Sequence, residues 1–276
     1  MNVYIHDGKG RWREAVTKAA IDHGYTVNGS PEGIGFFRPA QRPEPLKEDK
    51  ALYNRLKASV RWIQDQAQVD VYEDKAEQTR RWSKWMPPTW LIEDKQSALK
   101  FIEEAEYPFV SKAKEGSSSF NISLITNKSQ AKKLVDDAFG KGFPVRDGYQ
   151  VGYVIFQKFI KSTVCYRVNA IGKGRAIFYR YNYPGKWYTQ TGNVEPAFTM
   201  NEEAESLLEY SDRVFEDIGT QWCALDVLKE GGEWRLIETS LAWPWPSPGR
   251  CNEGTIFRTK RKWIEMFDAM FDSLED

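Results

Sequence analysis

The most informative stretch of this sequence is QWCALDVLKEGGEWRLIETS (221–240). Two largely apolar runs flank the paired glycines Gly231 and Gly232, a pattern typical of two antiparallel strands joined by a tight turn. Each strand carries one carboxylate far from the turn, Asp226 in the first strand and Glu238 in the second. An unpartnered carboxylate is costly in an apolar hairpin, so both acids require partners.

The length of the turn decides whether the two acids lie on the same face. A two-residue turn places Asp226 opposite Ile237 and sends the two carboxylates to opposite faces of the hairpin. A three-residue loop at 231–233 places Asp226 directly across from Glu238. Ser240 then joins the same face. We favour this second register, because it gathers three oxygen ligands of the kind that Mg²⁺ binds. The alternative is a pair of acids near a sheet edge that Lys or Arg neutralises.

A second stretch, YPFVSKAKEGSSSFNISLI (107–125), has the pattern of two strands joined by a Gly/Ser loop. Lys112 lies near the end of the first strand, and the loop EGSSS (115–119) follows it. Such a loop can offer backbone N–H groups and hydroxyls to phosphate oxygens, with the lysine as a point charge. Gly/Ser hairpin loops without a ligand are also common, and the spacing is not that of a Walker loop.

A third stretch, VIFQKFI (154–160), is an apolar strand interrupted by Gln157 and Lys158. At a junction between domains, its backbone groups could bind the edge of an adenine. A half-buried edge strand explains the same pattern equally well.

The first part of the chain has a small α/β pattern, and the rest is mixed. A short strand at 2–7 precedes an amphipathic helix at 10–25, an exposed proline-rich connection at 38–50 and a helix at 52–66. From about residue 70 the pattern predicts an α+β arrangement with antiparallel sheets. Helices are expected at 74–85, 94–105, 129–142, 200–219 and 259–275. Strands and hairpins are expected at 89–92, 109–114, 120–126, 149–160, 166–181 and 221–240.

The overall composition excludes some classes of function. Lys plus Arg and Asp plus Glu each number 39, so the formal net charge is zero. A general nucleic-acid or membrane-surface protein usually has a basic excess, so neither partner is expected. No apolar run approaches the roughly 18 residues of a membrane span, and the N-terminal residues do not resemble a signal peptide. We therefore expect a soluble, cytoplasmic protein.

The cysteines and aromatic residues carry weaker signals. Cys165, Cys223 and Cys251 are widely spaced and the chain has two histidines, which does not match a zinc site. We expect the cysteines to be reduced and mostly buried. Aromatic residues gather in two Pro- and Gly-containing stretches, 179–188 and 241–249, which are candidates for a binding surface.

Taken in chain order, these segments resemble the ATP-grasp superfamily of carboxylate–amine ligases. The resemblance is strongest to members that add amino acids to peptide tails, and the hinge is also similar to that of D-alanine–D-alanine ligases. It covers residues 72 to 250, about two thirds of the chain. The motifs that carry it are YEDKAEQTRRWSKWMPPTWLI (72–92), YPFVSKAKEGSSSF (107–120), QKFI (157–160), CYRVNAIGKGRAIFYR (165–180) and CALDVLKEGGEWRLIETS (223–240).

The resemblance implies an α+β fold in which two α+β subdomains with antiparallel sheets sandwich ATP, preceded by a small α/β domain. We expect the N-terminal domain at 1–72 and a small ATP-grasp subdomain with the phosphate loop at 73–158. The C-terminal subdomain with the metal site is expected at 159–276.

The resemblance also implies a set of site residues. ATP is expected to contact Lys75, Lys112, Gly116, Ser117, Ser118, Gln157, Lys158, Phe159 and Ile160. Asp226, Glu238 and Ser240 match the positions of the Mg²⁺ or Mn²⁺ ligands, and Arg167 and Arg180 match arginines that offset charge during catalysis. For each arginine, a structural salt bridge is the alternative role.

The implied activity is an ATP-dependent ligase that forms a C–N bond. It would phosphorylate a carboxylate to an acyl phosphate, which an amine then attacks, releasing ADP and phosphate; a peptide is one candidate substrate. Two alternatives remain, a small-molecule kinase on the same fold and a non-catalytic nucleotide-binding or interaction module. Ser240 stands where the family usually has asparagine, and Val164 or Cys165 stands near the place of a ribose-binding acid.

Overall fold

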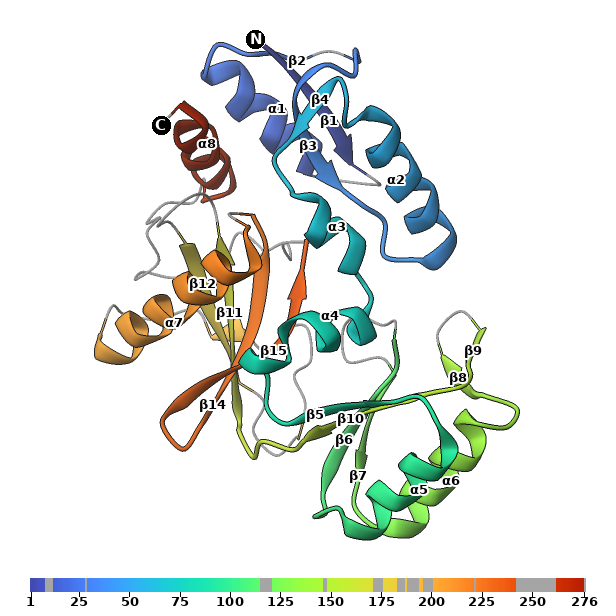
Figure 1. The fold of residues 1–276 in the computed structure, drawn as a ribbon. Coiled ribbons are helices and arrows are strands. Elements are labelled where there is room, and N and C mark those ends of the chain that lie inside the picture. Colours follow the sequence, from blue (N-terminus) through green and yellow to red (C-terminus); the bar gives the residue numbers. More distant parts are fainter. Residues whose placement is uncertain are drawn as a thin grey trace.

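The computed structural model describes residues 1–7, 12–27, 29–114, 121–145, 148–170, 176–182, 187, 194–195, 201–220, 222–241 and 262–275. Within them, the chain forms three main sheets and one two-stranded ribbon (Figure 1). The sheets follow one another along the sequence, so each is built from a continuous part of the chain. None of the helices in this described part combines the length and the apolar character that a membrane span requires.

The N-terminal sheet is parallel, with the strand order β2-β1-β3-β4. Its strands are β1 (Asn2–Asp7), β2 (Thr26–Val27), β3 (Gly33–Arg38) and β4 (Val60–Trp62). Helices α1 (Trp12–Asp22) and α2 (Pro43–Leu56) connect successive strands, which is the usual way to join parallel neighbours. This confirms the small α/β unit.

Helix α2 begins earlier than the sequence predicted. The expected exposed connection at 38–50 contains the first two turns of this helix, and residues 60–62 of the expected helix at 52–66 form strand β4 instead. The prolines explain the difference: Pro43 is the first helical residue, where a missing N–H and a fixed φ favour helix initiation. A proline-rich stretch therefore started a helix here.

The small sheet is antiparallel, with the order β5-β10-β6-β7. Its strands are β5 (Thr89–Ile92), β6 (Phe109–Lys112), β7 (Ile122–Ile125) and β10 (Val154–Lys158). Helices α5 (Lys95–Glu104) and α6 (Lys128–Ala138) pack on one face through a core that includes Ile102, Phe109, Val135 and Phe156. The ribbon of β8 (Phe143–Val145) and β9 (Gly148–Gln150) adjoins this unit.

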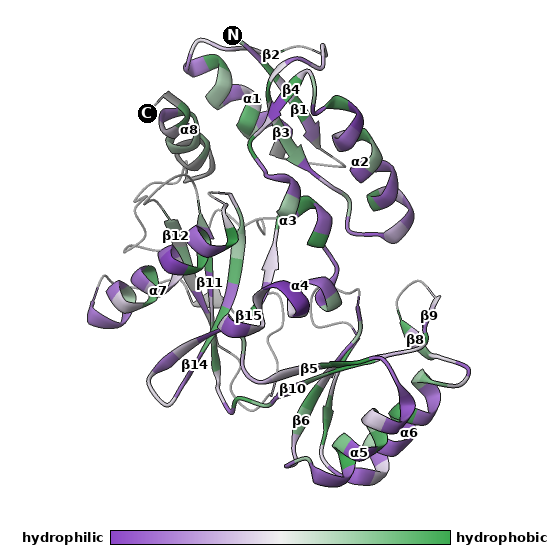
Figure 2. Ribbon diagram, viewed as in Figure 1, coloured by the Kyte–Doolittle hydropathy of each residue, from purple (hydrophilic) through white to green (hydrophobic). Residues whose placement is uncertain are grey.

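The large sheet is antiparallel, with the order β13-β12-β11-β14-β15. Its strands are β11 (Val164–Ala170), β12 (Ala176–Asn182), β13 (Val194–Glu195), β14 (Ala224–Glu230) and β15 (Glu233–Ser240). Helix α7 (Glu202–Ile218) covers one face and ends at Gly219, whose φ of 74° supports the left-handed C-cap. In Figure 2 this helix shows hydrophobic and hydrophilic residues on different sides, as expected for a helix that buries one stripe.

Two shorter helices run between the N-terminal sheet and the other two, and the last helix returns to the beginning of the chain. Helices α3 (Gln66–Val71) and α4 (Lys75–Trp82) follow β4 and precede the small sheet (Figure 1). Helix α8 (Lys262–Glu275) packs against α1, and Phe267 and Phe271 share a core with Val3 and Val16. The sequence did not predict this contact.

The α+β class with two antiparallel sheets after a small α/β unit is confirmed. The three sheets occupy residues 2–62, 89–158 and 164–240. The domain boundaries proposed from the sequence stay a prediction. Helix α8, which follows the large sheet in the chain, packs on the N-terminal unit.

Candidate functional site

The hairpin β14–β15 brings Asp226 and Glu238 opposite each other, as expected, but by a different route. Glu230 pairs with Glu233, so the turn has two residues, Gly231 and Gly232, with φ angles of 57° and 90°. Positive φ at both positions is the signature of a type I′ turn. The predicted three-residue loop is therefore wrong. The extra residue lies farther along β15, where a β-bulge shifts the register between Val227 and Asp226.

The bulge lets β15 place its apolar residues in the core and its carboxylate on the opposite face. Between the turn and the bulge, Trp234 and Leu236 point into the core under α7. With regular alternation Glu238 would follow them into that core. The bulge at Ile237 breaks the alternation and turns Glu238 to the other face, beside Asp226. The pairing of the two acids thus depends on one inserted residue.

Arg167 lies directly opposite Asp226 on the neighbouring strand β11. One guanidinium nitrogen, Nη1, lies 3.0 Å from each oxygen of the Asp226 carboxylate. Both side chains are mostly buried, with 11% and 18% of their surfaces exposed. Arg167 is therefore brought to Asp226. Its predicted catalytic role stays a prediction.

Two lysines reach the same acids from outside the large sheet. Lys75, the first residue of α4, places its Nζ 3.5 Å from Oε2 of Glu238. Lys112, the last residue of β6, donates a hydrogen bond from Nζ to the carbonyl oxygen of Ile237 at 3.2 Å. Both lysines are more than nine-tenths buried. We call this group the charge cluster: Lys75, Lys112, Arg167, Asp226 and Glu238.

Burial and mutual interaction shift the pKa values in the charge cluster. Burial, opposed by Glu238 and reinforced by Lys75, lowers the pKa of Lys112 to about 8. Burial raises the pKa of Asp226; Arg167 opposes this rise and Glu238 adds to it. Burial alone would raise the pKa of Glu238, but Lys75 and the other two cations together lower it. Among these five residues, cations exceed acids by one, so the cluster suits a ligand that brings negative charge.

Gln78 holds α4 against the end of β15, and the sequence analysis missed it. Its Oε1 accepts a hydrogen bond from the Thr239 N–H at 3.0 Å, and its Nε2 donates to the Thr239 carbonyl at 3.2 Å. Gln78 is 2% exposed. Lys75, Gln78 and Trp82 share one helical face and are all buried. Gln78 is a polar residue on the same helical face as Trp82, and this pattern could have revealed its buried contact.

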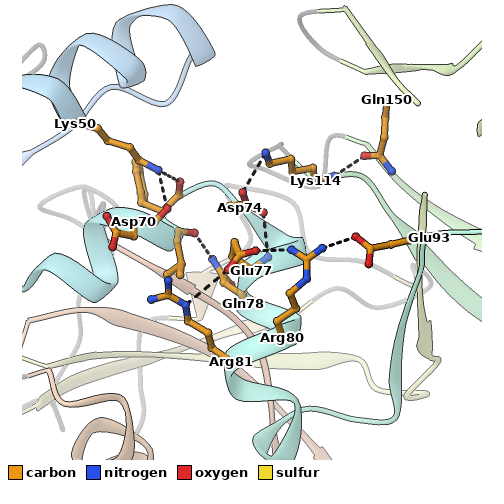
Figure 3. Close-up of polar contacts among 12 residues, drawn as sticks. Lys50, Asp70, Asp74, Glu77, Gln78, Arg80, Arg81, Glu93, Lys114 and Gln150 are labelled. Carbon is orange, nitrogen blue, oxygen red and sulfur yellow. Dashed lines mark hydrogen bonds and ion pairs between the residues drawn. The ribbon is translucent and has the colours of Figure 1, made fainter. Parts of the chain in front are cut away.

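A second missed contact joins α4 to the strand that carries Lys112. Figure 3 shows Lys114 between Asp74 and Gln150. The Lys114 Nζ lies 3.1 Å from Oδ2 of Asp74, and its backbone N–H donates to Oε1 of Gln150 at 2.7 Å. Its carbonyl oxygen accepts from the Lys75 N–H at 2.9 Å. These bonds fix the backbone between the two lysines of the charge cluster. Other polar contacts of α4, such as that of Arg80 with Glu93, lie on the exposed side.

The predicted hinge at 157–160 connects the small sheet to the large one. Gln157 is buried and donates from Nε2 to Oγ1 of Thr89 at 2.8 Å. The Lys158 N–H donates to the Pro88 carbonyl at 2.8 Å, and its Nζ lies 2.7 Å from Oε1 of Glu230 in the β14–β15 turn region. Phe159 and Ile160 follow the end of β10 and precede β11. Their contact with adenine stays a prediction.

Arg180 is not brought to the charge cluster. It pairs with Tyr166 across β11 and β12, so the two side chains lie on the same face. Tyr166 belongs to the core under α7, whereas Arg167, the next residue, points to the other face. The geometry therefore gives no support to the predicted catalytic role of Arg180. Ser240 lies at the end of β15, opposite Ala224 and two residues beyond Glu238.

Several predicted features fall outside the described residues. These are the loop residues Gly116, Ser117 and Ser118, Cys251, and most of the two aromatic stretches at 179–188 and 241–249. The other two cysteines, Cys165 and Cys223, are buried and free, as expected.

The donor chemistry of Asp226 and Glu238 fits a divalent cation. Both carboxylates are hard oxygen donors. Burial and the nearby Glu238 raise the pKa of Asp226, so a bound cation would stabilise its charged form. Each also has a cationic partner in the structure, which is the arrangement that the alternative interpretation required. Across the described residues, no group of three or more His, Cys, Asp or Glu is arranged to hold a metal. A metal site here would depend on these two carboxylates.

Comparisons of sequence identify no relative. No protein-family model matches the chain, and no curated protein matches it significantly.

Comparisons of structure give a clear result along the whole chain. The RimK domain ATP-grasp protein from Sphaerobacter thermophilus DSM 20745 is similar, with a TM-score of 0.70, 15% identity and 99% of each chain covered. The ATP-grasp ligase PsnB, solved with a minimal precursor, Mg and ADP, has a TM-score of 0.64 and 12% identity over 100% of this chain and 98% of its own. D-alanine–D-alanine ligase from Bacillus anthracis has a TM-score of 0.59 and 11% identity over 100% and 98%. The fold that the sequence motifs implied is thereby confirmed: this chain has an ATP-grasp fold of the kind found in carboxylate–amine ligases.

Proposed function

We propose that this chain is an ATP-dependent carboxylate–amine ligase that binds Mg-ATP at the charge cluster. One observation carries the proposal: Lys75 and Lys112 come from α4 and the small sheet, and both meet the carboxylate-bearing strand of the large sheet. A structural ion-pair network would not need more buried cations than acids. A bound triphosphate would supply the missing negative charge.

The proposed chemistry depends mainly on positioning and charge. Asp226 and Glu238 would hold Mg²⁺ or Mn²⁺, which would neutralise charge on the phosphates. Lys75 and Lys112 would contact phosphate oxygens, and Arg167 would keep Asp226 in place while adding positive charge beside it. A substrate carboxylate oxygen would bond to the γ-phosphorus as the bond to the ADP oxygen breaks. An amine would then bond to the acyl carbon and lose a proton, and phosphate would leave.

The substrates are proposed only as chemical classes. PsnB was also solved with the precursor peptide PsnA2 and AMPPNP, so a peptide is a reasonable candidate for the carboxylate or the amine partner here. ADP formation should be measured with Mg-ATP, hydroxylamine and a pool of carboxylates that includes peptides. The ligase should form hydroxamates, because hydroxylamine traps acyl phosphates. A stable phosphorylated product without any amine would instead indicate a kinase. The absence of turnover with every pool would indicate a non-catalytic module and contradict the proposal.

Nucleotide affinity should fall as the pH rises through about 8. In the folded protein, burial lowers the pKa of Lys112 from its usual 10.5 to about 8. Without bound nucleotide, the Lys112 ammonium therefore begins to lose its proton near pH 8. Above that pH, affinity for Mg-ATP should decrease by up to about ten-fold per pH unit. The free energy of unfolding should instead rise with pH between about 8 and 10.5, because in this range the unfolded chain binds more protons than the folded one.

Calorimetric titrations at several pH values, with urea unfolding alongside, measure both trends. Lys112→Met should lack both of them, since it has no titrating group at this position. A wild-type affinity that stays constant from pH 7 to about 9 would contradict a role for the Lys112 charge.

Asp74→Asn should raise the KM for ATP about three- to five-fold with little loss of stability. The Asp74 Oδ1 caps α4 by accepting from the Glu77 N–H at 3.0 Å, and asparagine preserves this cap. The ion pair with Lys114 is lost, and a partly exposed pair of this kind is worth about 1 kcal/mol. Steady-state kinetics and thermal unfolding should be compared with Asp74→Ala, which also loses the cap and about 1 kcal/mol of stability. An unchanged KM in Asp74→Asn would show that the ion pair does not assist nucleotide binding.

A further inference from the structure

A cavity of about 470 Å³ lies at the edge of the small sheet, beside α5. Its volume is within the range of roughly 300–1,000 Å³ that is typical of small-molecule sites. Its walls are mostly apolar and include five aromatic residues: Trp90, Phe101, Tyr107, Phe109 and Phe159. Three charged residues also line it: Glu104, Glu106 and Lys158.

The cavity and the charge cluster lie on opposite faces of the small sheet. Phe109 and Phe156 point into the core under α5 and α6. Trp90 pairs with Phe156, and Lys158 pairs with Phe109, so both point to this helix-covered face. Lys112, three residues after Phe109, points to the other face. A ligand in the cavity would therefore not contact the proposed phosphate-binding lysines.

The aromatic walls are held in place by the surrounding structure. The rings of Trp90 and Phe101 are 4.8 Å apart, and those of Tyr107 and Phe109 are 5.2 Å apart. The Tyr107 hydroxyl donates to the Ile102 carbonyl at 2.8 Å. Trp90 is still 38% exposed, so part of its surface is open to a ligand. Preformed aromatic walls reduce the entropy lost on binding.

The charges at the cavity favour a cation. Glu104 and Glu106 are both exposed at its edge, and α5 ends at Glu104, where the carbonyl end of a helix carries partial negative charge. Lys158, the only positively charged residue among the described residues that line the cavity, is paired with Glu230 at 2.7 Å. Aromatic faces also attract cations. The lining therefore combines flat apolar walls with a negative rim.

We propose that this cavity binds a small organic cation with a flat apolar group, that is, a protonated arylalkyl amine. The ring would lie against Trp90 and Phe101, and the ammonium would lie near Glu104 and Glu106. Lys158 and Phe159 belong to the predicted hinge, so the ligand would contact the hinge from behind the nucleotide-binding face. The proposal does not depend on ligase activity.

The probe is 2-phenylethylamine, with the neutral 2-phenylethanol as its matched control. Calorimetry or ligand-observed NMR should show saturable binding of the amine that is about ten-fold tighter than that of the alcohol. The double variant Glu104→Gln/Glu106→Gln should weaken amine binding about five-fold. Trp90→Ala should weaken it by a similar factor, because one aromatic wall is lost. Glu209→Gln, at an exposed position on α7, is the control and should bind like the wild type.

Three results would overturn the proposal: no saturable binding, equal binding of the alcohol, or unchanged binding by the glutamine double variant. A competition experiment with AMPPNP is a further test. The nucleotide should not displace the amine, because the two sites lie on different faces of the small sheet. Displacement would place the amine in the nucleotide site and would also overturn the proposal. These outcomes do not require turnover, so a failure of the ligase proposal remains distinguishable.

Discussion

Asp226→Asn should reduce ATP-dependent product formation roughly 100- to 1,000-fold, the range expected when one preorganised electrostatic contact to the transition state is lost. Asparagine keeps the shape of the side chain but removes one of the two proposed metal-binding charges. It also removes the carboxylate whose two oxygens each lie 3.0 Å from Nη1 of Arg167. Burial raises the pKa of Asp226, so its charge is already costly in the folded state. The variant should therefore remain folded.

The measurement is ADP release and product formation across a range of Mg²⁺ concentrations, with thermal unfolding as the check on folding. Glu233→Gln is the matched control, because it removes a carboxylate from the same hairpin at a site that is 69% exposed. It should retain full activity. If Asp226→Asn were as active as the control, the metal assignment would be wrong even though the fold assignment would stand.

Lys112→Met should weaken the binding of Mg-ATP about 10- to 100-fold, which corresponds to the roughly 1.5–3 kcal/mol of a charge-assisted hydrogen bond. Lys112 is 7% exposed, and its position next to the carboxylate-bearing strand leaves a bound phosphate as the natural partner of its charge. Without this ammonium, the remaining two cations and two acids of the charge cluster balance. Because the substitution removes a buried charge, the free energy of unfolding at pH 7 should not decrease.

Binding should be measured by calorimetry with AMPPNP, which avoids turnover, and stability by urea unfolding. Lys100→Met, at an exposed position on α5, is the matched control for the loss of one positive charge. It should bind nucleotide normally. Unchanged affinity in Lys112→Met would contradict the role of Lys112, whereas a large loss of stability would show that it mainly supports the large sheet.

Most of the fold could be predicted because the patterns were local. Gly231 and Gly232 marked a turn, α7 ended at Gly219, and β6 was evident from its apolar residues before Lys112. The start of α2 was missed because a proline is a stop signal within a helix but a favourable first residue. The helix α8 was predicted, but not its partner, since periodicity shows that a face is apolar without showing what covers it.

The candidate site was predictable in its members more than in its geometry. The pairing of Asp226 with Glu238 was right, but the three-residue loop that produced it was wrong. That loop would have turned Trp234 and Leu236 away from the core under α7, which is a signal that the sequence already contained. Only a two-residue turn followed by a bulge satisfies the apolar residues and the acids together. The contacts of Gln78 with Thr239 link residues 161 positions apart, and no local pattern encodes them.

The packing of α8 against α1 has a consequence for how the protein is made. Val3, Val16 and Phe36 begin to form a core as soon as the N-terminal unit leaves the ribosome, but Phe267 and Phe271, which share this core, are made only after both antiparallel sheets. Until then an apolar surface is exposed on the nascent chain, where it can recruit chaperones or self-associate. Removing residues 262–276 should therefore lower the yield of soluble protein, because it uncovers the core of the N-terminal unit.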